Sequence, residues 1–197
     1  MLPPRENSPT NAAVIQAEFS IDERRLLLKL AHDAVDAAVN QRELSLAFFP
    51  PHLSEPRGAF TTLYREGELR GCVGYVLPVV PLYRTVAESA KAAALDDMRF
   101  NPVTSQEVPL IEVVLSILSP LTPIKPEQVE VGRHGLVVTL GLRRGLLLPQ
   151  VPVEHGWDRE TFLSQTCHKA GLPLDAWQHG ATVEAFTAEV FGDRDVR

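Results

Sequence analysis

The sequence has little cysteine and no long apolar run, and each shortage excludes a class of protein. Only two cysteines, Cys72 and Cys167, occur among 197 residues. Two cysteines cannot build a disulfide framework, so a reducing, cytoplasmic location is the simpler interpretation. Apolar runs are short and end in proline, as at Leu146–Leu148 before Pro149. No segment is therefore predicted to span a bilayer.

The sequence also lacks a surplus of positive charge. Its 19 Lys and Arg residues stand against 25 Asp and Glu residues, which gives a formal net charge of -6. Because phosphate binding needs basic residues gathered on one face, this balance disfavours nucleic acid and anionic membranes as partners. The amino terminus has neither the basic start nor the apolar middle of a signal peptide, so residues 1–13 are predicted to be a flexible tail.

Motifs for several common chemistries are missing as well. The sequence contains no Gly-x-x-x-x-Gly-Lys-Ser/Thr phosphate loop, no Gly-x-Ser-x-Gly and no His-Glu-x-x-His. It also has neither Cys-x-x-Cys nor His-x-x-x-His, the spacings that a structural zinc site uses. We therefore predict no metal and no cofactor.

The residues that are present predict an α+β fold. Ser20–Glu23 fits a capping box at the start of an amphipathic helix. β-Branched and aromatic residues around Glu66-Gly67 predict an antiparallel hairpin from Ala59 to Val76. The alanine-rich stretch from Leu82 to Leu95 predicts a second helix. Alternation from Ile111 to Leu118 predicts a strand with one buried face.

The second half of the chain repeats this order. A glycine-punctuated hairpin is predicted from Leu136 to Leu148, a helix capped by Asp158 from Arg159 to Ala170, and a strand from Val183 to Phe191. We therefore expect a single domain over residues 14–197, with room for two lobes.

The spacing between the two halves is equal at two places. Leu69 and Leu142 begin similar hairpin strings 73 positions apart, and the closing strands begin at Leu110 and Val183, also 73 positions apart. Equal offsets predict two β-β-α-β repeats that pool their strands to cover one core. Chance alignment of a common element order is the alternative.

The most unusual string is Leu69-Arg70-Gly71-Cys72-Val73-Gly74. On a regular strand, Arg70 and Cys72 point to the same face, while Gly71 and Gly74 remove bulk beside them. A nearby guanidinium favours a thiolate, and missing Cβ atoms let a ligand or another backbone approach. Cys72 is therefore the candidate catalytic residue. The alternative is that Cys72 is a small buried residue and the glycines mark a bulge or a crowded sheet crossing.

A covalent mechanism at Cys72 would need a base within hydrogen-bond reach. Cys167 is not an equal candidate for the nucleophile, because it lies on the apolar face of its predicted helix and is expected in the core. The sequence does not choose among the histidines that could act as the base: His52, His134, His155, His168 and His179.

The connection from Pro149 to Asp158 concentrates polar and aromatic side chains. Gln150, Glu154 and Trp157 are candidate substrate-binding residues, because an amide, a carboxylate and an indole could face a pocket together. The alternative is that Trp157 anchors this connection and Asp158 caps the helix that follows.

Several short strings run in order along the chain, from about residue 20 to residue 192. They are Gly67–Gly74, Leu82-Tyr83, Val86–Glu88, Arg99-Phe100 with Pro102, Ile111–Val113, Leu118–Pro120, Gly135-Leu136, Gly145–Val151, Glu154, Gly156–Asp158, Cys167 with Lys169–Pro173, Trp177 and Glu189–Phe191. Taken together, these strings resemble the AMMECR domain family.

The resemblance implies an α+β fold with an antiparallel, partly barrel-like sheet and flanking helices, and a candidate site at Arg70–Gly74. It also implies a modification pathway shared with Memo-like or radical S-adenosylmethionine partners, which would act in trans. The chain departs from the usual pattern at Val73, Tyr75 and Phe186. A bulky ring at Tyr75 would narrow the entrance of the site, which puts an exact transfer of ligand preference in doubt.

Two functions compete on these residues. In the first, the hairpin that carries Arg70, Gly71, Cys72 and Gly74 forms a site for a small molecule or a substrate segment, with a reactive thiol. In the second, the chain is a non-enzymatic interaction module that docks a partner protein on Arg70, Phe100 and Trp157. Exposure of the two aromatic rings would favour the second function.

Overall fold

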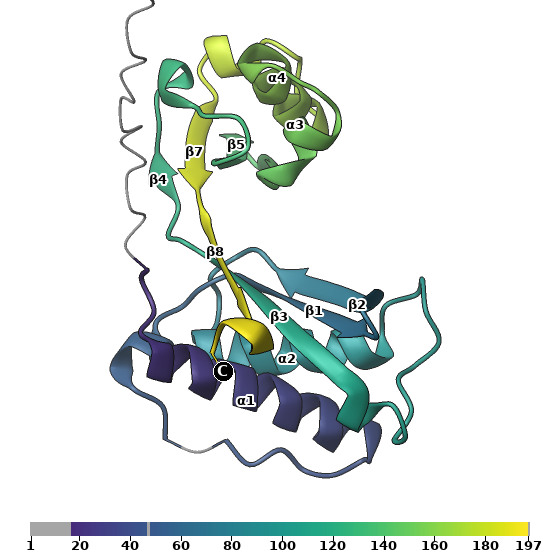
Figure 1. The fold of residues 1–197 in the computed structure, drawn as a ribbon. Helices are drawn as coiled ribbons and strands as arrows, with labels where there is room; N and C mark the ends of the chain where they lie inside the picture. Colours follow the sequence, from purple (N-terminus) through teal and green to yellow (C-terminus); the bar gives the residue numbers. More distant parts are fainter. Residues whose placement is uncertain (1–16, 47, 197) are drawn as a thin grey trace, which may run out of the picture.

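The fold was analysed on a computed structural model that describes residues 17–46 and 48–196. The predicted tail, residues 1–13, lies outside these residues. Figure 1 shows two lobes, each with one antiparallel sheet and helices on one of its faces. The predicted α+β class is confirmed. Neither sheet closes into a barrel: each is open and has four strands.

The first lobe begins with α1 (Ile21–Val39), which starts at the predicted capping box. The Ser20 Oγ accepts a hydrogen bond from the Glu23 backbone, and the Glu23 carboxylate accepts one from the Ser20 backbone. Together with α2, this helix covers one face of the first sheet. The elements of this lobe are α1, β1 (Ala59–Arg65), β2 (Glu68–Tyr75), α2 (Leu82–Leu95), β3 (Ile111–Leu118) and β8 (Ala188–Gly192).

The second lobe has the same plan. Its longer helix, α4, is capped as predicted by Asp158, whose side chain accepts a hydrogen bond from the Thr161 backbone. The elements of this lobe are β4 (Thr122–Pro123), β5 (Gly135–Leu140), β6 (Arg143–Leu147), α3 (Gln150–Glu154), α4 (Arg159–Lys169) and β7 (Thr182–Phe186). Short 3-10 turns lie at Pro51–Ser54, Val108–Leu110, Pro126–Gln128, Ala176–Gln178 and Asp193–Asp195.

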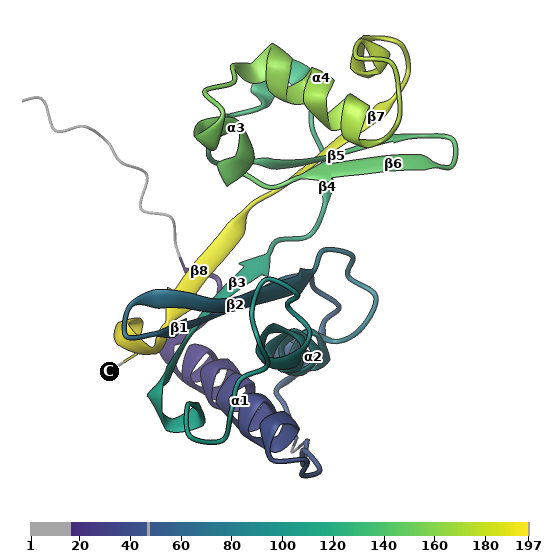
Figure 2. The same cartoon turned by 90° about the vertical axis from the view of Figure 1, so that its right-hand side faces the viewer.

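Strand order confirms the repeated β-β-α-β plan. The first sheet has the order β2-β1-β3-β8, and the second has the order β6-β5-β7-β4. The fourth strand of each sheet is the continuation of the third strand of the other, since β3 runs on into β4 and β7 runs on into β8 (Figure 2). The closing strand predicted from Val183 to Phe191 is therefore two strands in two different sheets.

The predicted offset of 73 positions is wrong in detail. Leu63 pairs with Gly71 and Val113, and in the second sheet Val138 pairs with Gly145 and Val183. The equivalent glycines are thus 74 positions apart and the equivalent closing-strand residues 70 apart. Unequal offsets show that the connections between strands have different lengths in the two halves.

The sequence predicted that the two repeats share one core, but the shared part of the core is small. Each lobe encloses its own apolar cluster between sheet and helices. A third, smaller cluster lies where the lobes meet, and we call it the junction cluster. It consists of Leu118, Val137 and Phe186, with Phe60, Val76, Leu121, Leu146, Leu148 and Ala188 packed against them. In the part of the chain that the structure describes, no helix is both long and apolar enough to cross a membrane.

Candidate functional site

The first sheet has one face without helices, and Cys72 lies on it. Leu63 points to the helices and is fully buried. Cys72 pairs with Thr62, which pairs with Val114, which pairs with Gly192. Because cross-strand partners share a face and neighbours along a strand alternate, all four lie on the side opposite Leu63. We call this side the helix-free face, and the second lobe lies over part of it (Figure 2).

Cys72 is partly exposed, and its sulfur, its backbone N–H and its backbone carbonyl each take part in a hydrogen bond. Its Sγ accepts a hydrogen bond from Thr62 Oγ1 at 3.3 Å. β2 is an edge strand, so no further strand pairs with its outer side. At Cys72, the side chains of Asp97 and Arg99 bond the backbone groups instead. The backbone N–H donates to Asp97 Oδ2 at 2.8 Å, and the carbonyl accepts from the Arg99 guanidinium at 3.4 Å.

Asp97 is firmly ionised. The Arg99 guanidinium bonds both carboxylate oxygens, at 2.9 and 2.7 Å, and holds the pKa of Asp97 well below its usual range, although burial acts in the opposite direction. The pKa of Arg99 is raised, chiefly by its hydrogen bond to Asp97. A carboxyl with so low a pKa is a poor base for the thiol.

The guanidinium beside Cys72 therefore belongs to Arg99, and Arg70 points elsewhere. The strand is not regular here, because pairing shifts from Leu63–Gly71 to Tyr64–Leu69 and leaves Arg70 in a bulge. Sequence reasoning assumed regular alternation, which the bulge breaks. The Arg70 side chain bonds the loop that follows α2: Glu107 Oε1 at 2.9 Å, the Asn101 carbonyl at 2.8 Å and the Pro102 carbonyl at 3.2 Å.

Gly71 and Gly74 leave space that other atoms of the protein occupy. A Cβ at Gly71 would lie 2.1 Å from the Ala93 carbonyl oxygen of α2. A Cβ at Gly74 would lie 2.2 Å from the Phe60 ring. Both positions thus match the alternative interpretation, in which the glycines mark a crowded crossing. The space at these glycines is taken up by other parts of the protein, which lets β2 lie close to α2 and to the junction cluster.

The five candidate histidines have other partners or lie at the surface. His52 bonds Glu23. His134 accepts from the Glu130 backbone, His155 stacks on Trp157 and His179 lies near Asp175, while His168 is exposed. Among the described residues, no hydrogen bond or ring contact joins a histidine to Cys72. Within residues 17–46 and 48–196, no group of three or more His, Cys, Asp and Glu is placed to hold a metal ion.

Two of the three candidates in the second segment do reach the helix-free face. The segment forms the short helix α3, which sequence reasoning took for a connection. Gln150 and Glu154 line a pocket of about 340 Å³ against Ala188 and Val190 of β8. Val190 lies two residues before Gly192 and therefore shares the face of Cys72.

Trp157 does not line that pocket. Its indole stacks on His155 with ring centroids 4.7 Å apart and packs against the second core. Phe100 is also half-buried, beneath the Arg99 guanidinium at 5.5 Å. The two rings have separate partners in separate lobes, so the structure does not gather them with Arg70 into one exposed surface.

Sequence reasoning missed four residues of this face. Thr62 and Val190 gave no signal, because a threonine and a valine on strands are ordinary. Asp97 and Arg99 follow the helix predicted from Leu82 to Leu95 and were not among the candidate site residues. Arg99 also stood in one of the strings shared with the resembling family, which was the signal that could have pointed to it.

Comparison with known proteins places these residues in a wider group. A family model described as AMMECR1 matches residues 28–191. A protein of Methanocaldococcus jannaschii is 39% identical over 189 residues, covering 91% of this chain and 94% of its own. One of Thermococcus kodakarensis is 43% identical, covering 84% and 87%. The crystal structure of an uncharacterized protein from Pyrococcus horikoshii matches with a TM-score of 0.69 and 41% identity, covering 87% of this chain and 92% of that one.

Proposed function

The chain belongs to the AMMECR1 family, and from that premise we propose that it binds a small molecule or a segment of a substrate on the helix-free face of its first sheet. The ligand would lie between Cys72 at the edge of β2 and the pocket that α3 lines against β8. The observation that carries this proposal is that Cys72 on β2 and Val190 of that pocket on β8 lie on the same face of the first sheet, at its two edge strands.

The chemistry of this face suits recognition better than unaided catalysis. The Cys72 sulfur accepts a hydrogen bond from the Thr62 hydroxyl, and the Arg99 guanidinium bonds the Cys72 carbonyl, so a donor and a cation lie near the thiol as they do at reactive cysteines. However, the carboxyl beside it is a poor base, and no described histidine contacts it. A reaction on a bound substrate would then be completed by a partner in trans. We keep the Memo-like or radical S-adenosylmethionine class of partner as part of the proposal.

Selective alkylation tests the thiol. Cys167 is fully buried and burial raises the pKa of its thiol, so it serves as an internal control in the native protein. We expect iodoacetamide at pH 7 to modify Cys72 and to spare Cys167, as followed by mass spectrometry. Arg99→Ala should slow the modification of Cys72 severalfold, whereas Arg25→Ala, at an exposed arginine of α1, should not.

The pocket is tested separately by a fragment library and backbone NMR. Bound fragments should shift the amide signals of Val114 and Val190 together, and Val190→Arg should abolish that response while the fold is retained. If Cys72 reacts no faster than free cysteine and Arg99→Ala has no effect, the thiol has no part in the site. If fragments shift neither amide, the helix-free face is not the binding surface.

A further inference from the structure

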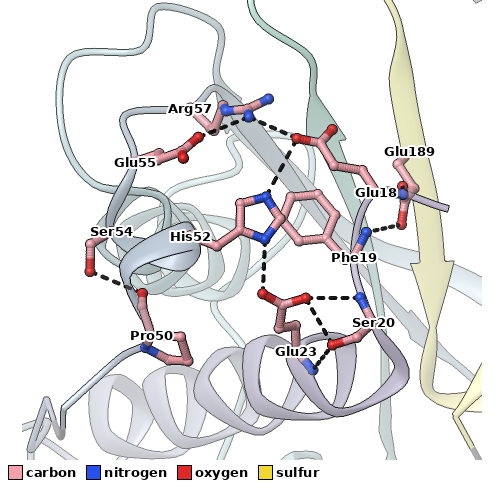
Figure 3. Close-up of polar contacts among 10 residues, drawn as sticks. All are labelled: Glu18, Phe19, Ser20, Glu23, Pro50, His52, Ser54, Glu55, Arg57 and Glu189. Atoms are coloured by element: carbon pink, nitrogen blue, oxygen red, sulfur yellow. Dashed lines mark hydrogen bonds and ion pairs between the residues drawn. The ribbon is translucent and has the colours of Figure 1, made fainter.

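A second cluster of charged residues lies at a corner of the first lobe, beside the start of α1 (Figure 3). It is formed where the residues before α1 meet β8 and the turn at Pro51–Ser54. Phe19 seals this corner: its side chain is buried, packs near Phe191 of β8 and stacks on the His52 ring with centroids 4.9 Å apart. The corner thus closes one end of the first core.

The His52 ring links two carboxylates from the start of α1. Its Nδ1 lies 2.8 Å from Glu23 Oε1, and its Nε2 lies 3.6 Å from Glu18 Oε1. Glu23 is also the capping-box residue of α1, so the ring is connected to the helix start itself. A neutral imidazole has one N–H and can donate to only one of the two carboxylates, whereas the protonated ring can donate to both.

The remaining charges fix the same segment from two other elements. Arg57, itself buried, bonds Glu18 at 2.7 Å and Glu55 at 3.1 Å. On β8, the Glu189 carboxylate accepts the backbone N–H of Glu18 at 2.7 Å and that of Phe19 at 3.4 Å. Glu189 is held in turn by an ion pair with Arg24 at 2.9 Å.

These groups leave an excess of negative charge that a proton can offset. The carboxylates facing the corner are Glu18, Glu23, Glu55 and Glu189, and the permanent cations are Arg24 and Arg57. The pKa of His52 is raised, chiefly by its hydrogen bond to Glu23. Burial alone would raise the pKa of Glu23, but the hydrogen bonds from Ser20 and His52 outweigh it and the pKa is lowered.

We propose that His52 is a proton-operated latch, which holds residues 18–20 closed over the first core when the ring is charged and loosens them when it is neutral. The sign follows from linkage. A raised pKa in the folded state contributes stability that is complete below the ordinary value of 6.5 and is lost as the pH rises through the folded value. The latch therefore responds to pH near neutrality, and it is independent of the function proposed above.

Hydrogen exchange at single amides tests the latch. The amides of Glu18, Phe19 and Ser20 are bonded within the corner, so their protection, corrected for the intrinsic exchange rate, reports whether it is closed. We expect this protection to fall between pH 5.5 and pH 8.5 by about tenfold for each unit by which the His52 pKa is raised. In His52→Gln it should be low and independent of pH.

His168→Gln, at an exposed histidine of α4, is the matched control and should behave as the wild type does. The proposal is overturned if His52→Gln keeps the wild-type pH dependence, or if the wild type shows none. Should His52→Gln fail to fold, an NMR titration of the wild-type imidazole decides: a His52 pKa at or below 6.5 would remove the latch.

Discussion

The two lobes share one strand plan but treat the same row of residues in opposite ways. In the first lobe the row is Cys72, Thr62 and Val114, and it lies partly exposed on the helix-free face. The positions with equivalent pairing in the second lobe are Leu146, Val137 and Glu184. There, Val137 is fully buried and Leu146 packs against it in the junction cluster.

This difference explains why a repeated fold would carry one site. In the second lobe, Val137 and Leu146 of this row pack in the junction cluster against Leu118, Phe60 and Val76 of the first lobe. That contact leaves the rest of the first sheet's helix-free face uncovered and places α3 beside it. The second lobe thus buries positions that stay partly exposed in the first lobe, where the proposed ligand would bind.

The largest expected effect on stability tests whether the two lobes are equivalent at the glycine where a helix crosses close to the sheet. A Cβ at Gly71 would meet a backbone oxygen at 2.1 Å, and one at Gly145 would meet the Ala170 nitrogen at 2.3 Å. We expect Gly71→Ala and Gly145→Ala each to lower the free energy of unfolding by about 3 kcal/mol, because the helix must shift. Denaturant titration measures this.

Gly67→Ala is the control for backbone strain alone. Gly67 has a φ of +84° and nothing within 4 Å of its Cβ position, so a cost of about 1 kcal/mol is expected. A loss at only one of the two crossing glycines would show that the helices approach their sheets differently, and the equivalence of the lobes would have to be withdrawn.

A smaller effect should separate the two lobes at their arginines. Arg70 and Glu107 are both largely buried and share two hydrogen-bonded contacts, whereas Arg144 meets Glu184 only at 3.8 Å and at the surface. Arg70→Ala should cost about 2 kcal/mol because Glu107 loses the guanidinium that bonds both of its carboxylate oxygens and keeps only Arg65 as a cation. Arg144→Ala should cost less than about 0.5 kcal/mol. Equal losses would contradict the assignment of Arg70 to a structural role.

The pH dependence of the same pair sharpens this result. Hydrogen bonds from Arg70 hold the pKa of Glu107 well below its usual range. The stability it contributes is therefore complete above the ordinary value of 4.5 and is lost as the pH falls below it. Wild type and Arg70→Ala should thus converge in unfolding midpoint on acidification, and parallel curves would argue against this pair as the cause.

The smallest expected effect concerns the row itself. Cys72→Ser should change stability by less than about 0.5 kcal/mol, since the side chain is partly exposed. Leu146→Cys should cost about 1 kcal/mol, because it removes apolar volume from the junction cluster. The thiol introduced in the second lobe should also react more slowly with iodoacetamide than Cys72. Comparable rates would show that the junction cluster is as accessible as Cys72. That result would contradict the difference in burial between the two lobes.

Local features of the fold were predictable because neighbours in the sequence determine them. The helix α2 begins at Leu82 and ends at Leu95, and β3 spans Ile111 to Leu118, as the residue patterns indicated. The hairpin at Glu66 and Gly67 was equally clear, since both residues take the positive φ that such a turn requires. Capping at Ser20 also followed from its own short string.

Non-local features were not predictable from these patterns. Alternation breaks at Ala185 and Phe186, which are both buried, just before the chain leaves one sheet and enters the other at Thr187. A bulge within a single strand gives the same pattern, so this break does not reveal the change of sheet. The partners of Arg70 lie 31 to 37 positions away, and the bulge that turns its side chain toward them depends on pairing with β1. For the same reason the sequence paired Cys72 with the wrong guanidinium.

The exchange of strands between the sheets also determines how the molecule can move. Two chain segments cross between the lobes, and they are tied together where they cross: Ser119 N donates to the Thr187 carbonyl at 2.9 Å, and Thr187 N donates to Ser119 Oγ at 3.0 Å. A hinge would have to bend both segments at once. The two lobes are therefore expected to keep their relative position when a ligand binds, and selectivity would come from fit to a fixed surface rather than from closure around the molecule.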